Sequence, residues 1–193
     1  GAVYRNSDPS DIVVTAAGGL VGEVVQIWKP KELNTFETEW GFSCMSYEIS
    51  GALGIKMAKP DQEVIVFVGD GSYLLQNSDI YSSVLYDKKL IIVVCDNGGH
   101  MVINRLQVAK GGNEYLCNLN AARATNVQFV DFEAHAKSMG ANGETVKSIS
   151  ELEAAFKRAK ESEKTYVISM KTDGYQWLEG TAFWESPTLQ VDN

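Results

Sequence analysis

Short runs of β-branched and other apolar residues alternate along the chain with longer segments in which apolar residues recur every three or four positions. Most of the short runs are too continuously apolar to have one face in water, which is typical of parallel strands covered on both sides. The pattern therefore predicts an α/β fold, with a mostly parallel sheet and helices on both faces. We expect strands over residues 12–15, 63–68, 90–95, 127–130, 145–147 and 166–170.

Helical spacing predicts the elements between these strands. The clearest helix covers residues 151–160, because Leu152, Ala155, Phe156 and Ala159 repeat at helical intervals. Ser150 and Glu153 have the spacing of a capping box at its start. Further helices are expected over residues 22–28, 47–58, 78–86 and 132–139.

Two stretches, residues 29–42 and 98–121, break this alternation. Compact α/β domains usually join their elements by short turns, so long irregular connections are more often functional loops than accidents. We expect both stretches to line a site.

Composition narrows the class of protein. With 193 residues, 45% of them hydrophobic, residues 1–193 can form a single domain with a sizeable core. The 25 acidic and 17 basic residues give a net charge of −8, which has the wrong sign for binding nucleic acid or an anionic membrane. The longest apolar runs are much shorter than the roughly 20 residues that span a bilayer. Three cysteines without a CxxC spacing favour a reducing, cytoplasmic location.

Candidate metal ligands lie where two predicted strands end. Residues 69–72 (Gly-Asp-Gly-Ser) follow one strand, and residues 96–99 (Asp-Asn-Gly-Gly) follow the next. If these strands are neighbours, the Asp70 carboxylate and the Asn97 amide oxygen meet at the edge where open α/β sheets bind ligands. Mg²⁺ prefers about six oxygen ligands, and Gly99 can add a backbone carbonyl. We therefore predict a magnesium site formed by Asp70, Asn97 and Gly99.

The same turn has features of a phosphate site. Gly71 lets a backbone N–H approach a phosphate closely, and Ser72 adds a hydroxyl at the start of the following helix. The alternative interpretation is that Gly69 to Gly71 is only a turn after a strand.

The spacing of these residues resembles a known signature. Positions 70 and 97 are 27 residues apart, and GDG…N at this distance, with a strand on each side, resembles the signature of thiamine-diphosphate-dependent enzymes. The resemblance implies thiamine diphosphate and Mg²⁺ as cofactors, bound by Gly69, Asp70, Gly71, Ser72, Asn97 and Gly99. The sequence departs from the signature at Asp96, where the family has Asn, and this adds a negative charge beside the metal site.

Two upstream segments fit the same resemblance. Residues 41–49 stand where the family holds the aminopyrimidine ring, which implies that Met45 is the apolar wedge that bends the cofactor and that the backbone near Ser43 and Met45 bonds to the ring. The other interpretation of Met45 is an ordinary core residue. We interpret Gly18, Gly19 and Leu20 as a second phosphate-facing turn, and a ligand-free helix-entry turn remains open. A dinucleotide site is disfavoured because Glu37 and Glu39, the acidic residues at the right distance, fall in a stretch expected to be irregular.

Within that superfamily, the runs VVTAAGGL, GFSCMSYEISGALGIKMAKPDQEV and INRLQ are most similar to the trihydroxycyclohexane-1,2-dione hydrolases of myo-inositol breakdown. The resemblance implies the C-terminal part of a longer enzyme, a homodimer or homotetramer, that opens a small cyclic diketone to 5-deoxyglucuronic acid. It also implies that the activating glutamate comes from an N-terminal pyrimidine-binding domain of a partner subunit, so we expect no catalytic residue on this chain. Because the chain opens with Gly1, we expect that residue to be a processing or cloning remnant.

Two alternatives to this function remain open. The nearest enzymatic one is an acetolactate synthase or 2-oxoacid decarboxylase domain, and the one from another class is a non-catalytic nucleotide-binding module. His100 either faces the substrate or is an ordinary loop histidine, and His135 is expected on a solvated helix surface. The aromatic residues near the C-terminus are either a lid or a packed tail; they are Tyr175, Trp177, Phe183 and Trp184.

Overall fold

A single sheet of six strands, in the order β2-β1-β3-β4-β6-β5, organises the described part of the chain. The computed structural model describes residues 1–123 and 126–178. Every neighbouring pair of strands is parallel, so the predicted α/β class with a parallel sheet is confirmed. The strands are β1 (Ile12–Thr15), β2 (Phe36–Thr38), β3 (Val64–Gly69), β4 (Ile91–Asp96), β5 (Asn142–Val146) and β6 (Tyr166–Lys171).

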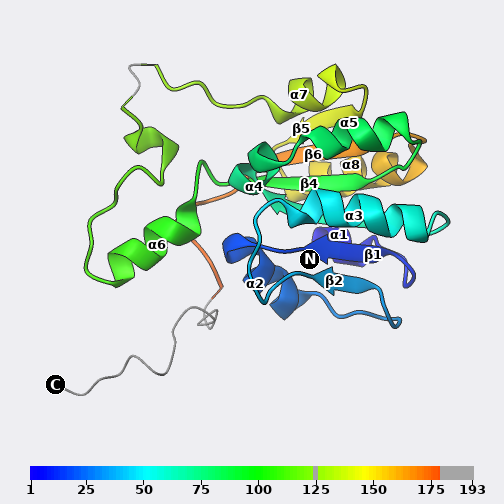
Figure 1. Ribbon diagram of the computed structural model, residues 1–193, viewed down its shortest axis with the longest axis horizontal. Coiled ribbons are helices and arrows are strands. Elements are labelled where there is room, and N and C mark those ends of the chain that lie inside the picture. Colours follow the sequence, from blue (N-terminus) through cyan, green and yellow to red (C-terminus); the bar gives the residue numbers. More distant parts are fainter. Residues whose placement is uncertain (124–125, 179–193) are drawn as a thin grey trace.

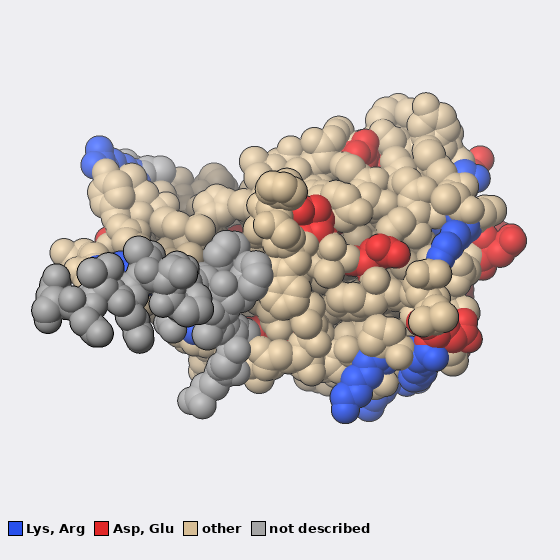
Figure 2. Space-filling view, turned by 60° about the horizontal axis from the view of Figure 1, so that its bottom comes forward, with Lys and Arg blue, Asp and Glu red and all other residues tan. Residues whose placement is uncertain are grey.

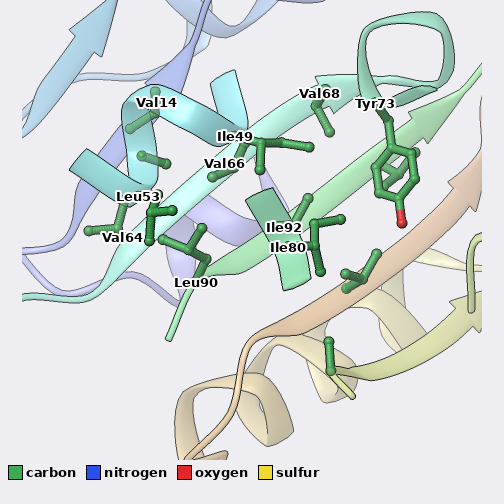
Figure 3. Packing of buried hydrophobic residues seen from close by; sticks show 14 of the residues in the cluster. Val14, Ile49, Leu53, Val64, Val66, Val68, Tyr73, Ile80, Leu90 and Ile92 are labelled. Carbon is green, nitrogen blue, oxygen red and sulfur yellow. The ribbon is translucent and has the colours of Figure 1, made fainter. Parts of the chain in front are cut away.

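Helices cover both faces of this sheet (Figure 1). On one face Val14 and Val66 pack with residues from α3, α5 and α7 (Figure 3), and on the other Val13 and Ile65 pack with α1, α2 and α8. Burial on both faces is why β3 and the first five residues of β4 carry no polar or charged side chain. The helices are α1 (Ala2–Arg5), α2 (Gly18–Ile27), α3 (Tyr47–Ala58), α4 (Asp70–Leu75), α5 (Ser78–Leu85), α6 (Met101–Ala109), α7 (Phe132–Ser138) and α8 (Ile149–Glu161), with a 3₁₀ turn at Leu119–Ala121.

The connections that follow β1 and β3 lead to opposite sides of this pair of neighbouring strands. The chain leaves β1 through α2 toward the edge strand β2, and leaves β3 through α4 and α5 toward β4 on the other side. In open α/β sheets the carboxyl ends of two such strands flank the crevice in which ligands bind. The topology therefore places the predicted metal and phosphate turns at a binding edge.

The prediction of a strand over residues 127–130 is wrong. This segment pairs with no strand, and the side chains of Phe129 and Val130 are 51% and 37% exposed. High β-propensity records how well a side chain fits a half-buried pleated surface, and this exposed segment has no such surface. The other predicted elements are present, with ends that differ by at most four residues.

Both stretches predicted to be irregular contain regular structure. Residues 29–42 include β2, which at three residues is too short to show an alternating pattern. Glu37 lies in this strand and Glu39 directly follows it, so the expectation that both fall in an irregular stretch is wrong. Residues 98–121 include α6, which begins directly after the glycine-rich turn. The short helices α1 and α4 are also absent from the predicted element set.

Charged side chains of both signs share the surface. On the face shown in Figure 2, Lys and Arg side chains lie mainly along one border, next to Asp and Glu side chains. No helix in the described ranges has the length and apolar character needed to cross a bilayer.

The cap of α8 is two residues earlier than predicted. Ser148, not Ser150, is the N-cap, and its Oγ accepts a hydrogen bond from the Glu151 N–H at 3.2 Å. Glu151 Oε2 in turn accepts a bond from the Lys147 N–H at 2.7 Å. The predicted box of Ser150 and Glu153 is therefore wrong, because β5 ends at Val146 and the chain enters the helix earlier.

Replacing the cap should destabilise the fold measurably. We expect Ser148→Ala to lower the free energy of unfolding by about 1 kcal/mol, because a first-turn N–H loses its acceptor. Ser150→Ala is the matched control and should cost clearly less. Urea denaturation followed by circular dichroism measures both; equal losses would show that the cap is not specific to Ser148.

Candidate functional site

Three segments meet at the carboxyl edge of β1, β3 and β4. Residues 16–19 follow β1, residues 69–72 span the end of β3 and the start of α4, and residues 96–100 span the end of β4 and the turn into α6. These strands are direct neighbours, since β3 pairs with both β1 and β4. Residues 41–46, which precede α3, reach the same place: Met45 Cε lies 3.5 Å from the position that a side chain on Gly71 would take. The structure therefore brings together the four segments that carry the predicted metal and cofactor residues.

The Asp70 carboxyl is buried at the start of α4, with the residue only 5% exposed. Burial raises its pKa, and the nearby Asp96 carboxylate raises it further. Hydrogen bonds from backbone N–H groups, including those of Gly99 and Asn97, oppose this rise. The site thus holds a carboxylate whose negative charge is only partly compensated by the protein.

Two further oxygens lie beside this carboxylate, those of the Asn97 amide and the Gly99 carbonyl. The Asn97 amide oxygen faces only acceptors, at 2.8 Å from the Gly99 carbonyl oxygen and 3.2 Å from Asp70 Oδ1. Neighbouring ligands of an octahedral Mg²⁺, each about 2.0–2.1 Å from the metal, lie about 2.9 Å apart. Turning the Asn97 amide by half a turn would place its NH₂ against the same two oxygens instead. With the amide oxygen facing inward, these three oxygens are spaced as ligands of Mg²⁺. With the amide turned, its NH₂ donates hydrogen bonds to the other two oxygens.

The charge of Asp96 is compensated. Its carboxylate forms an ion pair with Lys171 at 2.5 Å and also accepts the Gly98 N–H at 3.1 Å. Asp96, where the family signature has Asn, is therefore accompanied by a cation, Lys171. Across the described residues no cluster of three or more His, Cys, Asp or Glu side chains is placed to hold a metal, so the candidate metal site has one carboxylate and two neutral oxygens.

The turn that carries Gly99 is fixed by a segment far along the chain. Gly99 bridges to Asn118, the His100 N–H donates to the Cys117 carbonyl at 2.8 Å, and a Cβ on Gly99 would lie 2.2 Å from that carbonyl oxygen. Gly99 has φ +140°, a conformation that L side chains rarely adopt. Position 99 therefore requires glycine.

His100 lies over Gly71. A Cβ built on Gly71 would be 2.6 Å from His100 Cε1 and 2.7 Å from its Nδ1, so the imidazole occupies the space next to the glycine. The His100 side chain is exposed. It is therefore at the edge of the site, whereas its role stays a prediction.

Ser72 is bonded inside the protein. Its hydroxyl lies 2.9 and 3.1 Å from the two carboxylate oxygens of Glu48, to which it donates, and its Oγ accepts the Ser46 N–H at 2.7 Å. The Glu48 carboxylate also accepts the Ala17 N–H at 3.2 Å. One carboxylate thus links the turn after β1 to α4 directly and, through Ser72, to the loop before α3.

Glu48 was missed by the sequence analysis. It is 1% exposed and lies on the buried side of α3 with Ile49, Ala52 and Leu53. The signal that could have found it is an acidic residue at helical spacing from these apolar positions, because a buried carboxylate needs partners.

The start of α2 leaves its first N–H groups without a side-chain cap. Ala17 is the N-cap and makes no side-chain bond, and Gly18, Gly19 and Leu20 form the first turn. Gly18 has φ +81°, and the Leu20 side chain packs against the core. Backbone N–H groups at such a helix start can bind an anion.

The loop before α3 has two residues with positive φ, Ser43 at +50° and Ser46 at +81°. Glu39 accepts the backbone N–H groups of Phe42 and Cys44 at 3.0 and 2.7 Å, which holds the loop from its solvent side. Met45 is half-buried. Its methyl group lies next to Gly71, and its role beside a cofactor stays a prediction.

The remaining residues singled out from the sequence have other partners. His135 is not simply solvated: its Nδ1 is 3.0 Å from the hydroxyl of buried Tyr73. Tyr175 bonds to Asn118 and Glu114 through its hydroxyl, and the Arg105 guanidinium lies over the Trp177 ring. Both side chains therefore have partners within the described residues although they are 53% and 42% exposed, while Phe183 and Trp184 lie outside the described residues.

Comparison with known proteins is consistent with the site. Over residues 16–170 the chain matches the family described as thiamine pyrophosphate enzyme, C-terminal TPP binding domain. The 3D-(3,5/4)-trihydroxycyclohexane-1,2-dione hydrolase of Halalkalibacterium halodurans is 38% identical over 179 residues, which cover 90% of this chain and 28% of that protein. The protein of the same name from Listeria innocua is 40% identical over 177 residues, with 91% and 28% covered. The chain thus spans less than a third of the length of these relatives.

Solved structures share the fold at lower identity. The thiamine diphosphate-dependent 4-hydroxybenzoylformate decarboxylase of Rhodococcus jostii RHA1 has a TM-score of 0.75 at 20% identity, covering 89% of this chain and 31% of that chain. The benzoylformate decarboxylase of Polynucleobacter necessarius gives the same score and identity, with 92% and 33% covered. Since the family match includes β3, β4 and both turns that carry the oxygen cluster, the chain belongs to the C-terminal TPP-binding domain family of thiamine pyrophosphate enzymes.

Proposed function

We propose that this chain binds Mg²⁺ and thiamine diphosphate at the carboxyl edge of β1, β3 and β4, as part of an enzyme that hydrolytically opens trihydroxycyclohexane-1,2-dione in myo-inositol breakdown. The observation that carries the binding site is the convergence of the Asp70, Asn97 and Gly99 oxygens at 2.8 and 3.2 Å. The reaction is supported by relatives of that name that are 37–40% identical. A cytoplasmic location is part of the same proposal.

The protein would supply only one charged ligand to the metal. Asp70, Asn97 and Gly99 would occupy up to half of an octahedral shell, leaving positions for water and diphosphate oxygens. Because Asp70 is the only charged ligand of the three, it makes the largest electrostatic contribution to holding the cation. This division of ligands suits a metal that bridges the protein to a phosphate.

The two ends of the cofactor would meet different backbone groups. At the diphosphate end, the first turn of α2 offers the N–H groups of Gly18, Gly19 and Leu20, and Gly69 and Gly71 allow close approach. At the other end, Ser43 and Met45 would hold the pyrimidine ring through their backbone. Thiamine diphosphate, when bound, supplies an electron sink for breaking a carbon–carbon bond.

The activating glutamate is assigned to a pyrimidine-binding domain of a partner subunit in a homodimer or homotetramer. Glu48 is the one glutamate within the described ranges that is fully buried, and its carboxylate is already bonded to Ser72 and Ala17. This arrangement supports the proposal that the chain carries no catalytic residue of its own.

The competing enzymatic assignment is a 2-oxoacid decarboxylase or acetolactate synthase. At Gly19 a Cβ would meet only Val102 atoms, at 3.7 and 3.8 Å, and the family resemblance implies a larger Gln or His near this position in enzymes that act on 2-oxoacids. Because glycine at position 19 leaves space that a larger side chain would fill, this residue favours the bulkier cyclic substrate over a 2-oxoacid.

Removing the charged ligand should abolish magnesium-dependent binding. We expect Asp70→Ala to weaken thiamine diphosphate affinity in Mg²⁺ at least about 100-fold, close to 2.8 kcal/mol, because only neutral oxygens remain. Calorimetric titration measures this, with NAD and ATP as competing ligands. Asp61→Ala, an exposed carboxylate before β3, is the control. Retention of affinity within about threefold in Asp70→Ala contradicts the assignment.

Shortening Met45 should affect turnover more than folding. We expect Met45→Ala to lower kcat in the complete enzyme by about tenfold or more, because a cavity beside the cofactor relaxes its geometry. Steady-state kinetics at saturating thiamine diphosphate tests this. Unchanged turnover would make Met45 an ordinary packing residue.

The 193-residue chain alone should bind but not turn over. Losing an activating acid-base group typically lowers a rate by about 10²–10⁴-fold, and the wall over the pyrimidine would be lost with it. We expect no measurable ring opening when the chain is incubated with the cyclic diketone, Mg²⁺ and thiamine diphosphate. Turnover near that of the complete enzyme would show that the catalytic group is on this chain.

A further inference from the structure

Glu48 is a buried acid whose partners all belong to the candidate site. It is 1% exposed, and its carboxylate oxygens bond to the Ser72 hydroxyl and the Ala17 N–H. Burial raises its pKa, while hydrogen bonds to Ser72 and to backbone N–H groups lower it. No ion pair of Glu48 occurs in the described part of the chain.

The three linked segments have different proposed tasks. Ala17 is the N-cap of α2 and Ser72 is in the first turn of α4, and both helix starts are at the diphosphate end. Ser46 closes the loop that would hold the pyrimidine, and its N–H donates to Ser72 at 2.7 Å. The chain of contacts from Ala17 to Glu48, Ser72 and Ser46 therefore spans both ends of the cofactor.

We propose that Glu48 and Ser72 form a positioning pair. The pair fixes the loop over residues 41–46 (the pyrimidine loop) relative to the turns at residues 17–20 and 69–72 (the diphosphate turns). The inference rests on the proposed function and deepens it. The pair sets the distance between the two halves of the site, so a ligand that occupies both halves depends on it more than a ligand that occupies one.

This assignment also changes the role of Ser72. A serine hydroxyl has one hydrogen to donate, and here that hydrogen lies between Ser72 Oγ and the Glu48 carboxylate. Ser72 therefore acts through Glu48 and Ser46, not as a hydrogen-bond donor to the diphosphate as its position in the motif suggests.

Glutamine is a conservative replacement that should preserve the pair. In Glu48→Gln, Oε1 still accepts from Ala17 and from the Ser72 hydroxyl. The new NH₂ can donate to Ser72 Oγ, which has two acceptor sites and uses one for Ser46. Glu48→Ala removes all these contacts.

The experiment compares two ligands on the same variants. Calorimetry in Mg²⁺ measures the affinity of the chain for thiamine diphosphate, which reaches both ends, and for inorganic pyrophosphate, which reaches only one. We expect Glu48→Ala and Ser72→Ala to weaken thiamine diphosphate binding about tenfold or more and pyrophosphate binding less than about threefold. Glu48→Gln should stay within about threefold of the parent for both ligands.

A matched control separates the pair from general damage. Ser50→Ala, also on α3, removes a hydroxyl that donates to the Asp79 carboxylate at 2.6 Å, and it should change neither affinity. If Glu48→Ala does not fold by circular dichroism, Ser72→Ala carries the test, because it removes the link to Ser46 and leaves the Glu48 bond to Ala17.

The outcomes distinguish the two proposals. Equal losses for both ligands in Ser72→Ala would show that Ser72 binds phosphate directly and would overturn the positioning role. Unchanged affinities in both alanine variants would also overturn it, while the proposed cofactor site would stand. If the parent chain shows no magnesium-dependent binding of either ligand, the proposed function fails and the inference fails with it.

Discussion

A carboxylate removed from water must find its hydrogen bonds within the protein, and Glu48 finds them on segments that are far apart in the sequence. The Ala17 N–H and the Ser72 hydroxyl come from the ends of two neighbouring strands, and Ser72 passes the connection to the Ser46 N–H. Leaving such a buried group without partners costs several kcal/mol. The position of α3 over the sheet is therefore tied to the positions of both turns, and the geometry of the site follows from one buried polar contact as well as from apolar packing.

The other two buried acids at this edge are stabilised in different ways. Asp96 forms an ion pair with Lys171, which partly offsets its charge. Asp70 is surrounded by backbone N–H groups and by neutral oxygens, and burial and Asp96 both raise its pKa. Burying the Asp70 carboxylate without a cation costs free energy in the ligand-free chain. A bound divalent ion would offset that cost. The pairing of Asp96 with Lys171 leaves Asp70 as the acid available to such an ion.

Features that depend on local pattern could be predicted from the sequence, whereas features that depend on a partner could not. The strand at residues 12–15 and the helix at residues 47–58 match β1 and α3 residue for residue, because continuous burial and helical spacing are local signals. Residues 127–130 have the same composition as a strand but no neighbour to pair with. The candidate metal turn was predicted from the spacing of Asp70 and Asn97, and the structure brings these two residues together. Glu48 was not, because its role lies in contacts with residues 24 and 31 positions away in the sequence.

The two ends of the candidate site differ in how deeply the segments that form them are buried. The diphosphate turns extend from strands that are buried on both faces. The loop over residues 41–46, which is proposed to hold the pyrimidine, has Phe42 90% exposed and open space around Gly41. Its hydrogen bonds to Glu39, which is half-buried, lie where water competes for the same groups. Regions with few buried contacts open at the lowest free-energy cost, so this loop should open before the strand ends do. The Ser46 N–H donates to Ser72 Oγ, and Ser72 in turn donates to the buried Glu48 carboxylate. These two hydrogen bonds connect the loop to the buried start of α4, directly after β3, and so restrict its motion.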